Sequence, residues 1–204
     1  MLSAGFTTTT YLKSRLLPSA AAGDTDWDDA VAALGKGVAA KFDRHCNRGF
    51  ERVVGQLDVF SARASAWTLS RYPVETVTLV RTRDTLDAYS AITAGDWWID
   101  KTAGLLETRS TAGTPYEKLV VTYTGGYWLD PRDGTTLPSG ATALPDDVLE
   151  AWVLQCQHEA ESRGLFGSVS FRSQKDAASP KTTASGLLES TAEALRPHRR
   201  FAGE

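Results

Sequence analysis

The sequence predicts an α+β protein: a small helical bundle with an inserted antiparallel β-sheet or open barrel, and an extended C-terminal arm. Three observations lead to this prediction. Residues 24–47 show helical periodicity, residues 50–128 are rich in β-branched and aromatic side chains, and a second amphipathic helix begins at Pro145. The two helices can pair only if the strand-rich middle is an insertion between them. We therefore expect a helical core, a β-rich insertion with a connector loop, and a docking arm, covering 1–49 with 144–163, 50–143 and 164–204 respectively.

The first long helix is predicted from residue spacing and from its acidic start. Asp24 suits the N-cap position, and further aspartates follow in the first turn, where the helix dipole favours negative charge. Apolar residues recur at three- and four-residue spacing and form one face: Trp27, Val31, Leu34, Val38, Phe42 and Cys46. Gly35 and Gly37 interrupt this helix, and we expect them to permit close approach of a neighbouring helix. A shorter helix is expected over residues 7–17, ended by the proline that follows.

The middle of the chain changes to a strand-like pattern. Its apolar residues are β-branched or aromatic, several segments alternate, and Gly- or Pro-containing breaks separate them. The expected strands lie at 52–54, 57–60, 66–69, 74–80, 97–99 and 119–123. Short strands at this spacing are typical of a small antiparallel sheet or an open barrel. The glycine pair Gly125-Gly126 is expected to form the turn that leaves the sheet.

The second long helix is expected to begin at Pro145, because proline suits the first helical position. Asp146 and Asp147 place negative charge at the positive end of the helix dipole, and Gly164 ends the pattern. The apolar stripe of this helix consists of Val148, Leu149, Trp152, Val153, Cys156 and Ala160. We expect it to pair with the first helix in a small bundle.

The C-terminal forty residues are too polar to build a core of their own. Within them, Leu165–Phe171 alternates like a strand that has no partner strand nearby, which favours pairing with another chain. A linker-like stretch (173–185) leads to an expected short helix over Ser185–Leu195. A basic segment follows, Leu195-Arg196-Pro197-His198-Arg199-Arg200, which we call the basic tip. This pattern indicates an arm that becomes ordered on a partner.

Composition and charge set limits on function. The 204 residues, 42% apolar and 23% charged, are typical of one globular domain with appendages. Residues 164–204 hold six basic and four acidic side chains and carry +2, which leaves −5 for the rest of a chain whose formal charge is −3. This charge distribution favours docking on a protein over binding to the phosphate backbone of a nucleic acid. We find no signal peptide and no apolar run of about eighteen residues that would span a membrane. Cys46 and Cys156 are expected to be buried free thiols.

The sequence shows few patterns that indicate chemistry. It contains no metal-ligand spacing, no phosphate-binding glycine loop and no nucleophile elbow, so we expect no cofactor, no metal and no enzymatic activity. The acidic pairs are explained by helix starts. One alternative stays open: Trp97 and Trp98, followed by Asp100, could stack on a sugar beside a carboxylate, as in a carbohydrate-binding or hydrolytic module. A second is a DNA-packaging accessory that binds DNA through the basic tip.

The order of these parts resembles the gp6-like head–tail connector, or adaptor, proteins of tailed bacteriophages and gene transfer agents. Four segments show the resemblance. They are the helix 24–48, which begins with several aspartates; the turn Leu69-Ser70-Arg71-Tyr72-Pro73-Val74; the glycine-containing turn 121–127 followed by the start of a helix at 144–148; and the basic tip at 195–200. The match spans about residues 24–200. His198 stands where the family more often has tyrosine. The order and spacing carry more weight than any single motif.

The resemblance implies a structural protein that forms a ring, typically of twelve copies, beneath the portal protein of the capsid. The ring extends the DNA channel without sequence-specific DNA binding and supports a stopper or tail-completion protein. The protein would be part of the virion neck and be assembled in the host cytoplasm. The C-terminal arm is expected to dock on the portal through Phe166, Val169 and Phe171 for strand pairing, Leu188 and Leu195 for helix contacts, and Arg196, Arg199 and Arg200 for charge contacts. A stopper or tail terminator is the nearest alternative.

Overall fold

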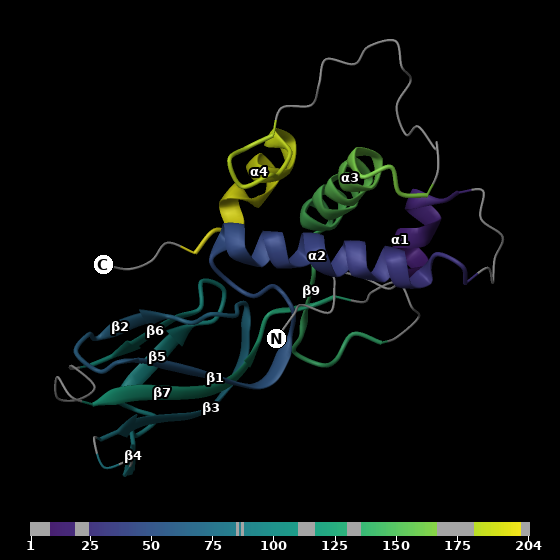
Figure 1. Ribbon diagram of the computed structural model, residues 1–204. Coiled ribbons are helices and arrows are strands. Elements are labelled where there is room, and N and C mark those ends of the chain that lie inside the picture. The colour runs from purple at the N-terminus through teal and green to yellow at the C-terminus, as the bar shows by residue number, and fades with distance from the viewer. Residues whose placement is uncertain are drawn as a thin grey trace. The chain divides into compact units, whose positions relative to one another are not determined.

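The computed structural model describes residues 9–18, 25–84, 86, 88–109, 117–129, 136–166 and 182–200 (Figure 1). The chain forms two compact units. The helical unit comprises Met1–Cys46, Leu129–Thr136 and Ala143–Arg199, and the β unit comprises Asn47–Trp128, Leu137–Thr142 and Arg200–Glu204. Helices and antiparallel sheets in one chain confirm the predicted α+β class, with sheets that stay open rather than closing into a barrel.

The helical unit contains the predicted helices, but three of them begin later than expected. They are α1 (Thr9–Leu16), α2 (Asp28–Cys46), α3 (Asp146–Ser162), α4 (Glu189–Leu195) and the 3₁₀ turn η1 (Arg196–His198). The two long helices begin at Asp28 and at Asp146, with Pro145 as the N-cap of the second, and the C-terminal helix begins at Glu189 rather than Ser185. Helix α2 contacts α1 and α3, and α3 also contacts α1 and α4. The predicted apolar faces supply the core: Val31, Leu34, Val38 and Phe42 from α2, and Val148, Trp152, Val153 and Cys156 from α3, are buried.

The two glycines of α2 have different surroundings. A Cβ atom at Gly35 would lie 2.9 Å from Cζ2 of Trp152 and 3.0 Å from Cδ2 of Leu12. The indole Nε1 of Trp152 donates a hydrogen bond to the carbonyl of Gly35 at 3.1 Å. The expected close helix approach is therefore confirmed at Gly35. At Gly37 it is wrong, because that residue is exposed and no atom lies within 4 Å of where its Cβ would be.

The β unit is built from two sheets. One has the order β1-β7-β3-β4, formed by Val53–Ser61, Lys118–Gly125, Val74–Arg83 and Tyr89–Ala91. The other has the order β2-β6-β5, formed by Ala66–Thr68, Leu105–Thr108 and Trp97–Asp100. A further pair consists of β8 (Tyr127–Trp128) and β9 (Thr142–Ala143). The expected segments 52–54 and 57–60 are one strand with a bulge between Val53 and Gln56.

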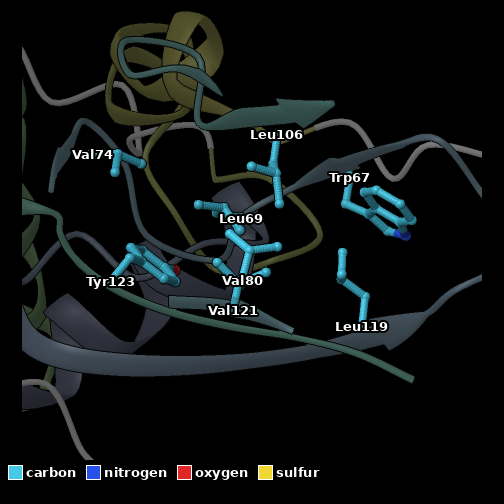
Figure 2. Packing of buried hydrophobic residues seen from close by; sticks show 8 residues of the cluster. All are labelled: Trp67, Leu69, Val74, Val80, Leu106, Leu119, Val121 and Tyr123. Atoms are coloured by element: carbon cyan, nitrogen blue, oxygen red, sulfur yellow. The ribbon is translucent and has the colours of Figure 1, made fainter. Parts of the chain in front are cut away.

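The core of the β unit contains side chains from both sheets (Figure 2). Cross-strand register places Val80 and Val121 side by side on the inner face of the four-stranded sheet, and Leu119 comes from the same side of β7. Trp67 and Leu106 come from the three-stranded sheet. Strands β4, β6, β8 and β9 were not predicted from sequence. They are short, and unlike β2 and β5, the strands β4, β6 and β9 lack the run of aromatic and β-branched residues that indicated a strand, while β8 is only two residues long.

Both cysteines are buried and free, as predicted. Burial, reinforced by the nearby carboxylate of Glu159, raises the pKa of the Cys156 thiol well above its usual value. A thiol held in its neutral form is a poor nucleophile and a poor metal ligand. Cys156 is therefore a packing residue of α3.

Candidate interaction surfaces

The C-terminal helix α4 packs against its own chain. Leu187 and Leu195 are fully buried, and Leu188 and Thr191 are nearly so. Helix α4 contacts α3, and the thiol of Cys46 lies 3.8 Å from the carbonyl of Leu195. Leu188 and Leu195, which the sequence suggested for helix contacts with a portal, therefore fill the core of the helical unit.

A buried glutamine fixes the segment that precedes α4. The side-chain oxygen of Gln155 accepts a hydrogen bond from the backbone N–H of Leu188 at 2.8 Å, and its Nε2 donates to the carbonyl of Gly186 at 3.2 Å. One amide thus binds the backbone much as a neighbouring strand would. Removing one partner of such a buried pair leaves unsatisfied polar groups, which costs about 1–3 kcal/mol. Gln155 is therefore a specific anchor for the C-terminal segment.

The other predicted arm residues lie in different environments. Phe166 is buried and makes an edge-to-face contact with Trp27, whose ring centroid is 5.4 Å away. Val169 and Phe171 lie outside the described residues. Arg196 and Arg199 are exposed, and Arg196 Nη1 is 3.1 Å from Glu193 Oε1. Arg200 donates a hydrogen bond to the carbonyl of Thr68.

The pKa of one histidine is lowered, in part by a residue of the basic tip. Burial lowers the pKa of His45, and the positive charge of Arg199 lowers it further. Ser185 Oγ lies 3.4 Å from His45 Nδ1. Arg199 therefore contributes a positive potential at the C-terminal end of the helical unit.

A second surface, not singled out from the sequence, is the outer face of the four-stranded sheet. Directly opposed residues share a face, so the register defines its rows. They are Leu57–Thr122–Leu79, Val59–Val120–Arg81–Ala91 and Ser61–Lys118–Arg83–Tyr89. Leu57 is 51% exposed, Val59 46%, Leu79 36% and Tyr89 48%, so this face carries a cluster of accessible apolar side chains. We call these rows the outer sheet face.

Arg81 lies across this outer sheet face. Its guanidinium carbon is 3.9 Å from the ring centroid of Tyr89, a cation–π geometry. Its Nε is buried and has no hydrogen-bond partner. Stacking on Tyr89 therefore restrains the Arg81 side chain on this face.

A buried hydrogen-bond network holds the turn Leu69–Pro73 against the sheet. The carboxylate of Asp58 accepts hydrogen bonds from the backbone N–H and the hydroxyl of Ser70, both at 2.7 Å, and from the Tyr123 hydroxyl at 2.9 Å. Gln56 Nε2 donates to the same carboxylate at 3.0 Å, and the Tyr123 hydroxyl accepts from the N–H of Arg71. The carboxylate of Asp58 and the hydroxyls of Ser70 and Tyr123 are all hydrogen-bonded within this cluster, which stabilises the turn.

The same network makes stability depend on alkaline pH. Burial raises the pKa of Tyr123 above its ordinary value of 10, and the charge of Asp58 raises it further. A group whose pKa is raised by folding gives its full stabilisation below the unfolded pKa and loses it as pH rises beyond that value. We expect the urea midpoint to fall as pH rises above about 10. Tyr123→Phe should be less stable at pH 8 and show a shallower alkaline decline; equal slopes for the two proteins would contradict this account.

The residues considered for sugar stacking do not form one platform. Trp97 and Trp98 are consecutive on β5, so their side chains point to opposite faces of the strand. Trp97 packs against the core, whereas Trp98 is 52% exposed. The carboxylate of Asp100 accepts hydrogen bonds from the N–H groups of Thr102 and Ala103, which makes it a turn residue.

The described residues contain neither a metal-binding cluster nor a membrane-spanning helix. No group of three or more His, Cys, Asp or Glu side chains there is arranged to hold a metal ion. Within the same part of the chain, none of the helices combines the length and apolar character needed to cross a membrane.

Comparisons with solved structures give a fold match over nearly the whole chain. A chain in the "Neck of empty GTA particle computed with C6 symmetry" aligns with a TM-score of 0.58 and 17% identity, covering 96% of this chain and 91% of that one. A chain in the "Virion of native gene transfer agent (GTA) particle" aligns with a TM-score of 0.57 and 18% identity, with the same coverage. No protein-family model and no curated protein matches the sequence. The chain therefore shares the fold of a protein found in gene transfer agent particles.

Proposed function

We propose that the protein is a structural component of the neck of a phage-like particle, and specifically its head–tail adaptor. One observation carries the proposal: both units of the chain, and the order in which they are connected, align with chains from a particle neck and a virion at 96% coverage. A match of this extent includes the inserted β unit as well as the helical bundle. It favours a protein of the same architecture over one that shares only a common helical motif.

The adaptor would act as a ring of about twelve copies docked beneath a portal protein. The ring would extend the DNA channel and present a platform for a stopper or tail-completion protein. One matched neck was computed with sixfold symmetry, a symmetry with which a ring of twelve is compatible. A net charge of −3 suits a conduit through which DNA passes without sequence-specific binding. The protein would be located in the neck of the virion and assembled in the host cytoplasm, with no catalytic step.

Docking on the portal is proposed to involve residues 164–204. Arg196 and Arg199 are exposed. They would supply charge contacts together with Arg200, and Val169 and Phe171, which lie outside the described residues, would supply strand pairing. Leu188 and Leu195 would act indirectly, because they hold α4 against α3, and Phe166 likewise packs on Trp27. The arm therefore combines a helix anchored on its own chain with a basic end available to a partner.

The test is binding to the portal ring of the same particle, followed by native mass spectrometry. We expect multiple copies of the protein to bind the portal, and Arg196→Glu/Arg199→Glu to weaken binding about tenfold or more, with a stronger effect at low salt. Lys36→Glu/Arg63→Glu makes the same charge change at exposed positions elsewhere and should bind normally. Point variants are preferable to a chain ending at Arg163, which would lose the buried Leu187 and Leu195.

Two outcomes would contradict the proposal. The adaptor role would be excluded if the wild-type protein does not bind the portal ring. Binding to a tail-side protein instead of the portal would indicate a stopper or terminator. Normal binding by the Arg196→Glu/Arg199→Glu protein would exclude only the role of the basic tip.

A further inference from the structure

The outer sheet face differs from the rest of the β unit in its charge. The β unit as a whole is neutral, with ten basic and ten acidic residues. On the outer sheet face, however, the charged residues are Arg81, Arg83 and Lys118, and all three are basic. They occupy two neighbouring rows at one end of the face, and the exposed Leu57 and Leu79 lie in the row next to them. This face therefore fits a partner surface that is apolar and acidic.

The helical unit offers a surface of that kind. It contains 15 acidic and 12 basic residues, a formal charge of −3. Along α3, Asp147, Glu150 and Leu154 follow one another at three- and four-residue spacing and so share a face. Leu154 is 48% exposed, although it is a leucine in a helix that otherwise buries its large apolar side chains. We call these three residues the α3 stripe.

We propose that the outer sheet face of one copy docks on the α3 stripe of the next copy, and that this contact builds the ring. The inference rests on the proposed function, because a ring of more than two copies requires a head-to-tail contact between two different surfaces. Self-pairing of the outer sheet face is disfavoured, because it brings two sets of basic side chains into one interface, and a self-complementary contact closes as a dimer rather than a ring. The basic end of the outer sheet face and the carboxylates of the α3 stripe are opposite in charge, and both surfaces include exposed leucines. Within its own chain Glu150 is paired with Arg15, and Asp147 Oδ2 lies 3.8 Å from His198 Nε2, so docking would exchange these surface contacts for contacts with the next copy.

The apolar part is tested by replacing leucines with threonine, which is well tolerated in strands. Leu57→Thr/Leu79→Thr should raise the subunit concentration needed for ring assembly about tenfold or more, measured by mass photometry or native mass spectrometry with and without the portal. Trp98→Thr removes an exposed apolar side chain from the other sheet and should assemble normally. Unchanged circular dichroism and melting temperature would show that each variant is folded.

The pairing itself is tested by exchanging charges. Lys118→Glu and Glu150→Lys should each weaken assembly severalfold, and the two changes in one chain should restore it, because every interface of the ring then again opposes a lysine and a glutamate. Both side chains are exposed. Glu150→Lys also replaces a surface ion pair with Arg15 by two like charges, so the melting temperature of this variant is compared with that of Glu150→Gln, which removes the ion pair without adding a positive charge.

The outcomes separate this inference from the proposed function. A wild-type ring that forms on the portal while all of these variants assemble normally would overturn the inference and leave the adaptor role intact. Single charge variants that weaken assembly without rescue in the combined chain would also overturn it, since the two surfaces would not face each other. A wild-type protein that stays monomeric even with the portal would overturn both.

Discussion

Replacing Gly126 by alanine is expected to lower the free energy of unfolding by about 4 kcal/mol or more, enough to prevent folding of a domain of ordinary stability. Gly126 has a φ of +98°, a conformation that L-residues with a Cβ rarely adopt. A Cβ there would also collide with the backbone of Glu51 and Arg52, coming within 2.7 Å of the Glu51 carbonyl carbon. The Glu51 carbonyl accepts a hydrogen bond from Arg71 Nη1 at 2.6 Å, so the backbone of residues 51–52 cannot easily move away. Denaturation by urea, or failure to obtain soluble protein, measures this effect.

A matched glycine separates backbone strain from the collision. Gly55 has a φ of +70°, but no atom lies within 4 Å of where its Cβ would be. Gly55→Ala should therefore show only the conformational cost, about 1–2 kcal/mol. The difference between the two variants reports how closely residues 51–52, where the chain enters the β unit, approach the glycine turn through which it leaves. Equal losses would contradict that close approach.

Replacing Gly35 by alanine should destabilise the helical unit by about 1–3 kcal/mol, although alanine is the better helix former. The added methyl would press on the indole of Trp152 and on Leu12, both of which are almost fully buried. It would also disturb the hydrogen bond from Trp152 to the Gly35 carbonyl. Thermal or urea unfolding of the variant measures the loss.

The neighbouring glycine of α2 supplies the control, with a change of opposite sign. Gly37 is exposed and nothing lies near its Cβ position, so Gly37→Ala should stabilise the protein by about 0.5–1 kcal/mol through helix propensity alone. Two identical substitutions two residues apart on one helix would then shift stability in opposite directions. A stabilising effect at both positions would show that α3 lies further from α2 than the structure places it.

In strand β1 the burial of side chains is the reverse of what the apolar alternation predicts. Apolar alternation alone would bury Leu57 and Val59 and expose Asp58, whereas the structure buries Asp58 and exposes both apolar residues. Burial of the carboxylate is possible because Ser70, Tyr123 and Gln56 all donate hydrogen bonds to it. Ser70 and Tyr123 are distant in sequence, so no local pattern reveals this network. Because the side chains of Leu57 and Val59 are exposed, they become part of the outer sheet face.

The packing partner of the C-terminal helix is a second feature that the local sequence does not predict. Its helical residues and basic tip are readable from spacing and charge, and a helix does form at Glu189–Leu195. An amphipathic helix needs a partner for its apolar face, but its sequence does not say which one. Here the partner is α3 of the same chain, with Gln155 as the anchor, and the side chain of a single glutamine gives no signal of that role.

The sequence by itself determined the α+β class, the two long helices with the strand-rich insertion between them, the main strands, and the burial of both cysteines. These follow from periodicity, helix-start charges and turn residues, which act over a few neighbouring positions. Only the tertiary structure decided which face of β1 is buried, where α4 packs, which α2 glycine lies against Trp152, and that β4, β6, β8 and β9 exist at all. Each of these depends on hydrogen bonds or packing between residues far apart in sequence, and such contacts leave no local periodicity to read.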